Sequence, residues 1–321
     1  MGTSGEDRTE NVASEQRMKE APKDLPKKQG WKLFCLIIGM MLWVFASVVA
    51  SQLVVGYILL WMVGVEEFSR SVMTAIYSAL SYVVAMLLVI IVPQLFLHRR
   101  GQARTKQGVT KRASLRQRSE AESKQGVMKR ASLERRDQVG VKSTVTAQKL
   151  KPVDYEELGL HKWPTWTDIG LAPVGYIVYL ILAAGLVALF SLFPWFNAGE
   201  VQEVGFSYYV TGGDRLVAFL TLVVVAPIAE EIIFRGWLYG RMREELLKKV
   251  SNRTSMVISV FLVSLLFGIV HMQWNVGVNV FALSLVLCAL REITGTIHAG
   301  ILLHMLKNGI AFYLLFVMGI G

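Results

Sequence analysis

Charged residues are scarce in this chain: they make up 18% of its 321 residues, whereas hydrophobic residues make up 53%. In soluble globular proteins about a quarter of the residues are charged. The apolar residues gather in runs long enough for a bilayer-spanning helix, which needs about 20 residues. These runs cover residues 32–63, 71–97, 168–196, 215–238, 256–272, 277–291 and 297–320. The sequence therefore predicts an all-α fold, a polytopic transmembrane helical bundle with about seven spans, within a range of about six to eight.

Cysteine is rare as well. Cys35 and Cys288 both lie within apolar runs, and their spacing excludes a disulfide framework or a zinc finger. The HExxH motif of the zincin metalloproteases is absent.

The first 30 residues are polar and the first apolar run is too long for a signal-peptide core, so we expect no cleavable signal peptide. Solid apolar blocks also differ from the alternating pattern of a transmembrane β-barrel.

The net charge of +10 is unevenly distributed. Lysine and arginine concentrate in the N-terminal tail, in residues 99–162 and in residues 241–253, whereas residues 197–214 contain acidic residues and no lysine or arginine. The positive-inside rule then places the N-terminus and the basic loops on the cytoplasmic side. We expect a multi-pass integral protein of the plasma membrane. The basic loops favour anionic lipid as a partner. We expect no nucleic-acid partner, because no nucleic-acid-binding module accompanies the charge.

The composition changes along the chain and predicts four regions. Residues 1–30 are charged and poor in large apolar residues, which is typical of a disordered cytoplasmic tail. Residues 31–98 contain two transmembrane helices. Residues 99–166 form a basic cytoplasmic loop, and residues 167–321 form the main transmembrane core.

The basic loop contains an internal repeat, because residues 106–118 return with few changes as residues 124–136. One interpretation is a duplicated, solvated linker. The other is a basic amphipathic segment on the inner leaflet, in which phosphorylation of Ser114 and Ser132 would weaken attraction to anionic lipid. Vesicle binding by a peptide of residues 99–150 that does not respond to anionic lipid content would contradict the second interpretation.

Charged side chains interrupt the run at 215–238 in the sequence EEIIFR. Each charge at the bilayer centre costs about 2.5–3.5 kcal/mol on insertion scales, so the group needs partners or water. Glu231 and Arg235 are four residues apart and can pair on one helical face, whereas Glu230 is rotated by about 100° and has no such partner. A purely structural ion pair would leave Glu230 unexplained. We expect Pro227 to kink the helix and free a carbonyl, and Gly236 to admit a neighbouring helix or a substrate backbone.

Two later runs also contain polar side chains at helical spacing. Phe267 and His271 are four residues apart, and so are His304 and Asn308. If these faces meet Glu230, the site can deprotonate water and stabilise an oxyanion. Glu230, His271 and His304 could instead bind a metal such as zinc. The spacing does not choose between these alternatives, so the cofactor stays unknown.

These residues form three patterns, EExxxR from Glu230, FxxxH from Phe267 and HxxxN from His304. In order and spacing they resemble the CPBP intramembrane proteases, also called the Abi family. That family includes type II CAAX prenyl endopeptidases and bacteriocin-processing or immunity proteins. The resemblance covers about residues 215–315, and Phe267 and Pro227 would support the substrate cavity.

The resemblance implies hydrolysis of peptide bonds in membrane-associated proteins or peptides. One glutamate of the first motif would activate water, and Arg235 would orient a carboxylate. Helix geometry favours Glu230 as the base and Glu231 as the support paired with Arg235. The family has been described both as metalloproteases and as glutamate proteases, so the resemblance leaves zinc open.

The resemblance also implies that His271 assists or binds, while His304 and Asn308 stabilise the oxyanion. Two other functions remain alternatives. A non-catalytic bacteriocin-immunity or scaffold protein would keep the fold without turnover. A proton-coupled transporter also uses intramembrane Glu, His and Arg, but such proteins often contain paired broken helices, and here one proline-interrupted span carries the charge.

Overall fold

The computed structural model describes residues 27–62, 70–95, 155–200 and 212–319. The chain divides into two units, residues 1–90 with 154–321, and residues 91–153. Nearly all of the second unit, including the repeat at 106–118 and 124–136, lies outside the described residues. The same holds for the predicted tail up to residue 26, so the tail and the basic loop stay predictions.

Seven described helices are long and apolar enough to cross a membrane, which confirms the predicted fold class. The sixth, expected to be short at 277–291, is longer at both ends. The seven spans are Gly30–Ile58, Val72–Leu95, Trp166–Phe190, Gly212–Leu247, Asn252–Ile269, Trp274–Thr294 and His298–Val317.

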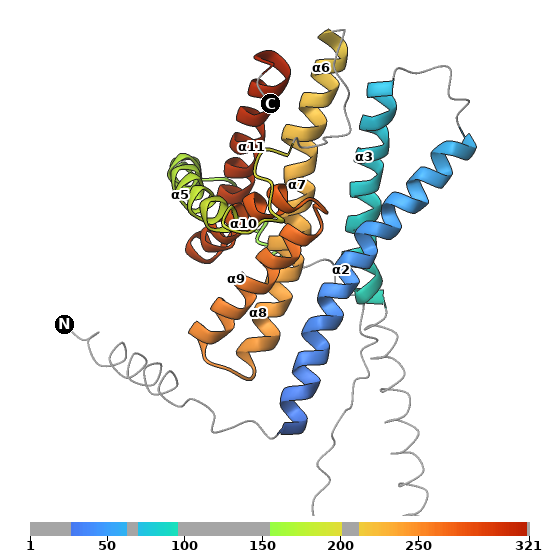
Figure 1. Ribbon diagram of the computed structural model, residues 1–321. Helices are drawn as coiled ribbons and strands as arrows, with labels where there is room; N and C mark the ends of the chain where they lie inside the picture. Colours follow the sequence, from blue (N-terminus) through green and yellow to red (C-terminus); the bar gives the residue numbers. More distant parts are fainter. Residues whose placement is uncertain (1–26, 63–69, 96–154, 201–211, 320–321) are drawn as a thin grey trace, which may run out of the picture. The chain divides into compact units, whose positions relative to one another are not determined.

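The first two spans form a helical hairpin. Helix α2 (Lys27–Met62) packs against α3 (Arg70–Met86), and α3 continues into the π-helical segment η1 (Leu87–Ile91). Figure 1 shows α3 alongside the fourth span, where it contacts α6 and α7. Small buried side chains such as Ser81 and Ala85 lie on α3, and they permit a close approach between helices.

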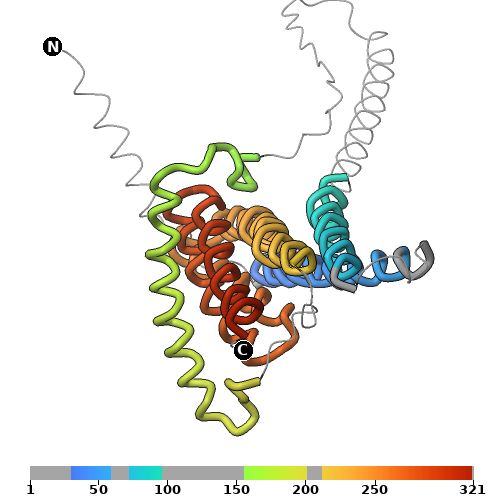
Figure 2. Tube along the Cα trace, turned by 90° about the horizontal axis from the view of Figure 1, so that it is seen from above, coloured from blue at the N-terminus to red at the C-terminus, as the bar shows by residue number. Residues whose placement is uncertain are grey.

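The remaining spans pack around α10 (Trp274–Thr294), which carries many buried apolar side chains. Helix α5 (Trp166–Phe190) lies beside α10 and α11 (His298–Phe312) in both views, and α9 (Asn252–Ile269) packs on α10 (Figures 1 and 2). Helix α11 ends in the π-helical segment η4 (Tyr313–Val317). This packing brings α11 and the fourth span together.

The fourth span changes its helical geometry along its length. It consists of α6 (Gly212–Phe219), the π-helical η2 (Leu220–Val225), α7 (Ala226–Glu231), the π-helical η3 (Ile232–Tyr239) and α8 (Gly240–Leu247). The N–H of Ala226 donates to the carbonyl of Thr221, five residues back, just before Pro227. The expected effect of Pro227 therefore takes the form of a wide turn in front of the proline.

The close approach predicted at Gly236 is also present, but its partner is a backbone turn. A Cβ at Gly236 would lie 3.1 Å from the carbonyl oxygen of Leu158, and one at Gly240 would lie 3.0 Å from that of Glu157. Arg291 holds the same turn by donating from Nη2 to the Glu157 carbonyl at 3.2 Å. The turn at residues 155–160 thus takes the place that a helix or a substrate was expected to fill.

Candidate active site

The two adjacent glutamates of the fourth span face different surroundings. Glu231 is fully buried and forms an ion pair with Arg235, with 2.9 Å between Oε1 and Nη1. The guanidinium of Arg235 lies 4.3 Å from the ring centroid of Phe267, so its charge also meets an aromatic face. The i, i+4 pairing predicted from helical spacing is present, and it is closed off from solvent.

Helix α11 also contacts Glu231. The Nδ1 atom of His304 lies 3.2 Å from Glu231 Oε1. A Cβ added to Gly300, one turn before His304, would lie only 3.0 Å from Glu231 Oε2. The absence of a side chain at Gly300 therefore lets α11 pack closely against the buried carboxylate.

Glu230 points toward the hairpin instead. Its Oε1 accepts a hydrogen bond of 2.7 Å from the hydroxyl of Tyr82, and its Oε2 lies 3.8 Å from His304 Nε2. The side chain of Glu230 is 15% exposed, whereas that of Glu231 is not exposed at all. His304 is therefore placed between a reachable carboxylate and a buried one.

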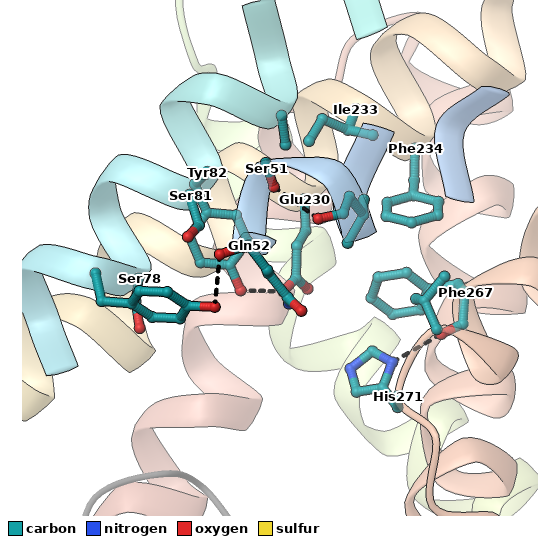
Figure 3. Close-up of a pocket in the computed structure, with 14 residues that line it drawn as sticks. Ser51, Gln52, Ser78, Ser81, Tyr82, Glu230, Ile233, Phe234, Phe267 and His271 are labelled. Carbon is teal, nitrogen blue, oxygen red and sulfur yellow. Dashed lines mark hydrogen bonds between the residues drawn. The ribbon is translucent and has the colours of Figure 1, made fainter. Parts of the chain in front are cut away.

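His271 lies just beyond α9, in a turn and not inside the helix as expected from the run at 256–272. Its Nδ1 lies 2.7 Å from the carbonyl oxygen of Phe267. A carbonyl only accepts, so Nδ1 carries the hydrogen and Nε2 is the acceptor in the neutral ring. Figure 3 shows His271 and Glu230 on the same cleft, which has a volume of about 210 Å³.

The ring of Phe267 joins these groups. Its centroid lies 5.0 Å from that of His271 and 6.0 Å from that of His304, both edge to face. Phe234 packs on the same ring at 4.9 Å. Phe267 is buried and also lines the cleft. The Phe267 ring therefore packs against the imidazoles of His271 and His304 and against the guanidinium of Arg235.

Asn308 and Pro227 both lie away from the cleft, and Asn308 supplies a hydrogen bond that the backbone near Pro227 lacks. The Nδ2 of Asn308 donates to the carbonyl oxygen of Leu222 in η2 at 2.9 Å. Pro227 is buried at the start of α7, and neither it nor Asn308 is among the residues that line the cleft. The amide thus contacts the carbonyl that the proline leaves without a helical donor.

Residues 212–310 match the family model described as Type II CAAX prenyl endopeptidase, Rce1-like. No curated protein and no solved structure matches the chain.

This region is similar to the CPBP protease family.

The family match confirms the resemblance inferred from the three motifs, and it supports a CPBP-type intramembrane protease. The matched region starts at α6 and ends within α11, so it contains Glu230, Glu231, Arg235, His271, His304 and Asn308. The hairpin α2–α3 lies outside it. The seven apolar helices and the family together make the chain an integral membrane protein.

Two residues near the CPBP site were not found from the sequence, Tyr82 and Gly300. Tyr82 was overlooked because the second span precedes the motifs, although a run containing Ser78, Ser81 and Tyr82 is unusually polar for its setting. Gly300 is four residues before His304, which puts it on the motif-bearing face of α11.

The donor set does not fit a resident metal ion in the described part of the chain. No three His, Cys, Asp or Glu side chains there are grouped so that they could hold one. Glu230, His271 and His304 were named as possible ligands, and the structure does not group them as a ligand set; their contacts with protein groups involve Oε1, Nδ1 and Nδ1 respectively.

Proposed function

We propose that the protein is an intramembrane endopeptidase that hydrolyses peptide bonds of membrane-associated proteins or peptides by means of water activated by Glu230. The observation that carries the proposal is the difference in environment between the two glutamates. Glu231 is buried and neutralised by Arg235, whereas Glu230 is partly exposed on the cleft. Only the carboxylate of Glu230 can contact a water molecule and a substrate.

In the proposed reaction, Glu230 removes a proton from water as the water oxygen attacks the scissile carbonyl carbon. His271 Nε2, on the cleft side, accepts the second water hydrogen and fixes the direction of attack. The tetrahedral intermediate collapses with cleavage of the C–N bond, and the proton held by Glu230 passes to the leaving amine. The carboxylic acid and the amine account for all atoms of the peptide and the water.

His304 is the proposed donor to the oxyanion. When protonated, it donates Nδ1–H to Glu231 and has Nε2–H available on the side of Glu230. A preorganised donor at a developing negative charge contributes about 10²–10³ in rate. The family resemblance implied that Asn308 shares this task, but its amide contacts Leu222. We therefore assign Asn308 to holding α11 against η2.

Cleavage of a library of membrane-anchored peptides in liposomes tests the proposal. The expected result is cleavage by wild type and a loss of about 10²–10⁴-fold in Glu230→Gln, as for removal of a general base. His304→Ala should lose activity as well. Glu245→Gln is the matched control, because that carboxylate is on the same span and forms a surface pair with Lys248. Full activity of Glu230→Gln would disprove the assignment, and binding without cleavage by wild type would favour the scaffold alternative.

We further propose the plasma membrane as the location, with the N-terminus and residues 241–253 on the cytoplasmic side. The concentration of lysine and arginine in these segments supports this orientation. The test replaces Cys35 and Cys288 by serine, introduces single cysteines at residues 249 and 199, and labels intact cells with an impermeant maleimide. Residue 199 should react and residue 249 should not; the reverse would overturn the orientation.

A further inference from the structure

The cleft that contains Glu230 has one wall that does not come from the CPBP region. Glu230, Phe234 and His271 line it from the matched region, whereas the opposite wall belongs to α2 and α3. This second wall is polar for a pair of transmembrane helices. Its hydroxyl and amide side chains are Ser51, Gln52, Tyr77, Ser78, Ser81 and Tyr82.

Tyr82 differs from its neighbours in the direction of its hydrogen bond. The hydroxyl of Ser51 donates to the Val48 carbonyl, and that of Tyr77 donates to the Gln52 carbonyl, so both bonds stay within the hairpin. The Tyr82 hydroxyl leaves the hairpin and donates to Glu230 Oε1 at 2.7 Å (Figure 3). Hydrogen bonds to a charged partner are roughly twice as strong as neutral ones.

The packing of α3 makes this bond possible. Ser81 and Ala85 are small and buried, and α3 contacts α7, the segment that carries Glu230. On a helix, Ser78, Tyr82 and Ala85 share one face. The ring of Tyr82 therefore reaches across a close helix–helix contact, and its hydroxyl ends at one carboxylate oxygen.

We propose that Tyr82 is a positioning residue for the hydrolytic reaction: it holds Oε1 of Glu230, which leaves Oε2 facing His304 and the attacking water. The inference rests on the proposed function, because it assigns Glu230 as the base. It also means that the hairpin outside the family match completes the site. A base that is free to rotate loses its alignment with water, and small misplacements of this kind lower turnover strongly.

The test compares Tyr82→Phe with wild type in liposomes, with a membrane-anchored peptide that wild type cleaves. The variant retains the ring and its packing and removes one hydroxyl. We expect kcat to fall about 10- to 100-fold, with KM within about twofold. Tyr179→Phe is the matched control, since Tyr179 is a buried tyrosine on α5 whose ring packs on Tyr176. It should behave as wild type.

A second measurement does not depend on cleavage. A hydrophobic carbodiimide modifies carboxyl groups within membranes, and peptide mass spectrometry reports its rate at Glu230. Tyr82→Phe should label several-fold faster than wild type, because Oε1 is no longer engaged, and Tyr179→Phe should not change the rate. An unchanged kcat, or a rise in KM alone, would overturn the inference, as would an unchanged labelling rate. If wild type cleaves no peptide, the proposed function fails, while the labelling rate still decides whether Tyr82 holds Glu230.

Discussion

Asn308 on α11 donates its side-chain amide to the main-chain carbonyl of Leu222 at 2.9 Å. That carbonyl has no donor at the usual helical positions. The N–H of Ala226, four residues on, donates to Thr221, and Pro227, five residues on, has no N–H. A side chain from another helix therefore completes the backbone hydrogen bonding of the fourth span.

Asn308→Ala should destabilise the protein, because it leaves the Leu222 carbonyl without a hydrogen-bond donor. The expected loss in the free energy of unfolding is about 1–3 kcal/mol. In a Pro227→Ala background the new N–H at position 227 can donate to Leu222, so the same substitution should cost clearly less. Thermal unfolding of the four proteins in detergent gives this double-mutant cycle. Equal destabilisation in both backgrounds would show that the amide of Asn308 does not compensate for Pro227.

The two glutamates should separate in stability measurements. Glu231→Gln leaves the charge of buried Arg235 without a counterion, which costs about 3–5 kcal/mol, so its Tm should fall markedly. Glu230→Gln should keep a Tm near that of wild type, because the amide oxygen still accepts from Tyr82 and the side chain is partly exposed. Equal losses in the two variants would contradict the distinct environments described above.

Gly300→Ala should reduce both stability and cleavage. The added methyl would lie 3.0 Å from Glu231 Oε2, so α11 or the carboxylate must move, at a cost of about 1–3 kcal/mol. Gly309→Ala on the same helix is the matched control, because its methyl would meet Val223 at an ordinary 3.6 Å. Thermal unfolding and the peptide assay measure both effects, and indistinguishable results for the two variants would argue against the close contact at Gly300.

Metal chelation should leave cleavage within about twofold of the untreated rate, because the proposed base needs no Lewis acid. The measurement is turnover by wild type before and after dialysis against EDTA, followed by addition of zinc. Loss of activity on dialysis and its recovery with zinc would contradict the prediction. Glu230→Gln, His271→Ala and His304→Ala would then be compared for zinc content.

Much of the fold was accessible from the sequence because the bilayer imposes a simple requirement. Each crossing must satisfy its own backbone groups, so long apolar runs become helices whatever their partners are. The helix edges were less predictable: His271 belongs to an apolar run but lies in the turn beyond α9. Apolar composition does not mark the residue at which a helix ends.

The sequence by itself determined relationships within single helices, such as the pairing of Glu231 with Arg235, because a fixed helical period places residues four apart on one face. It also determined the three motifs and their order. Only the tertiary structure decided which helix each face meets: Tyr82 at Glu230, Gly300 at Glu231 and Asn308 at Leu222. These contacts depend on how helices pack against each other, and that packing arises from side chains distributed over the whole bundle.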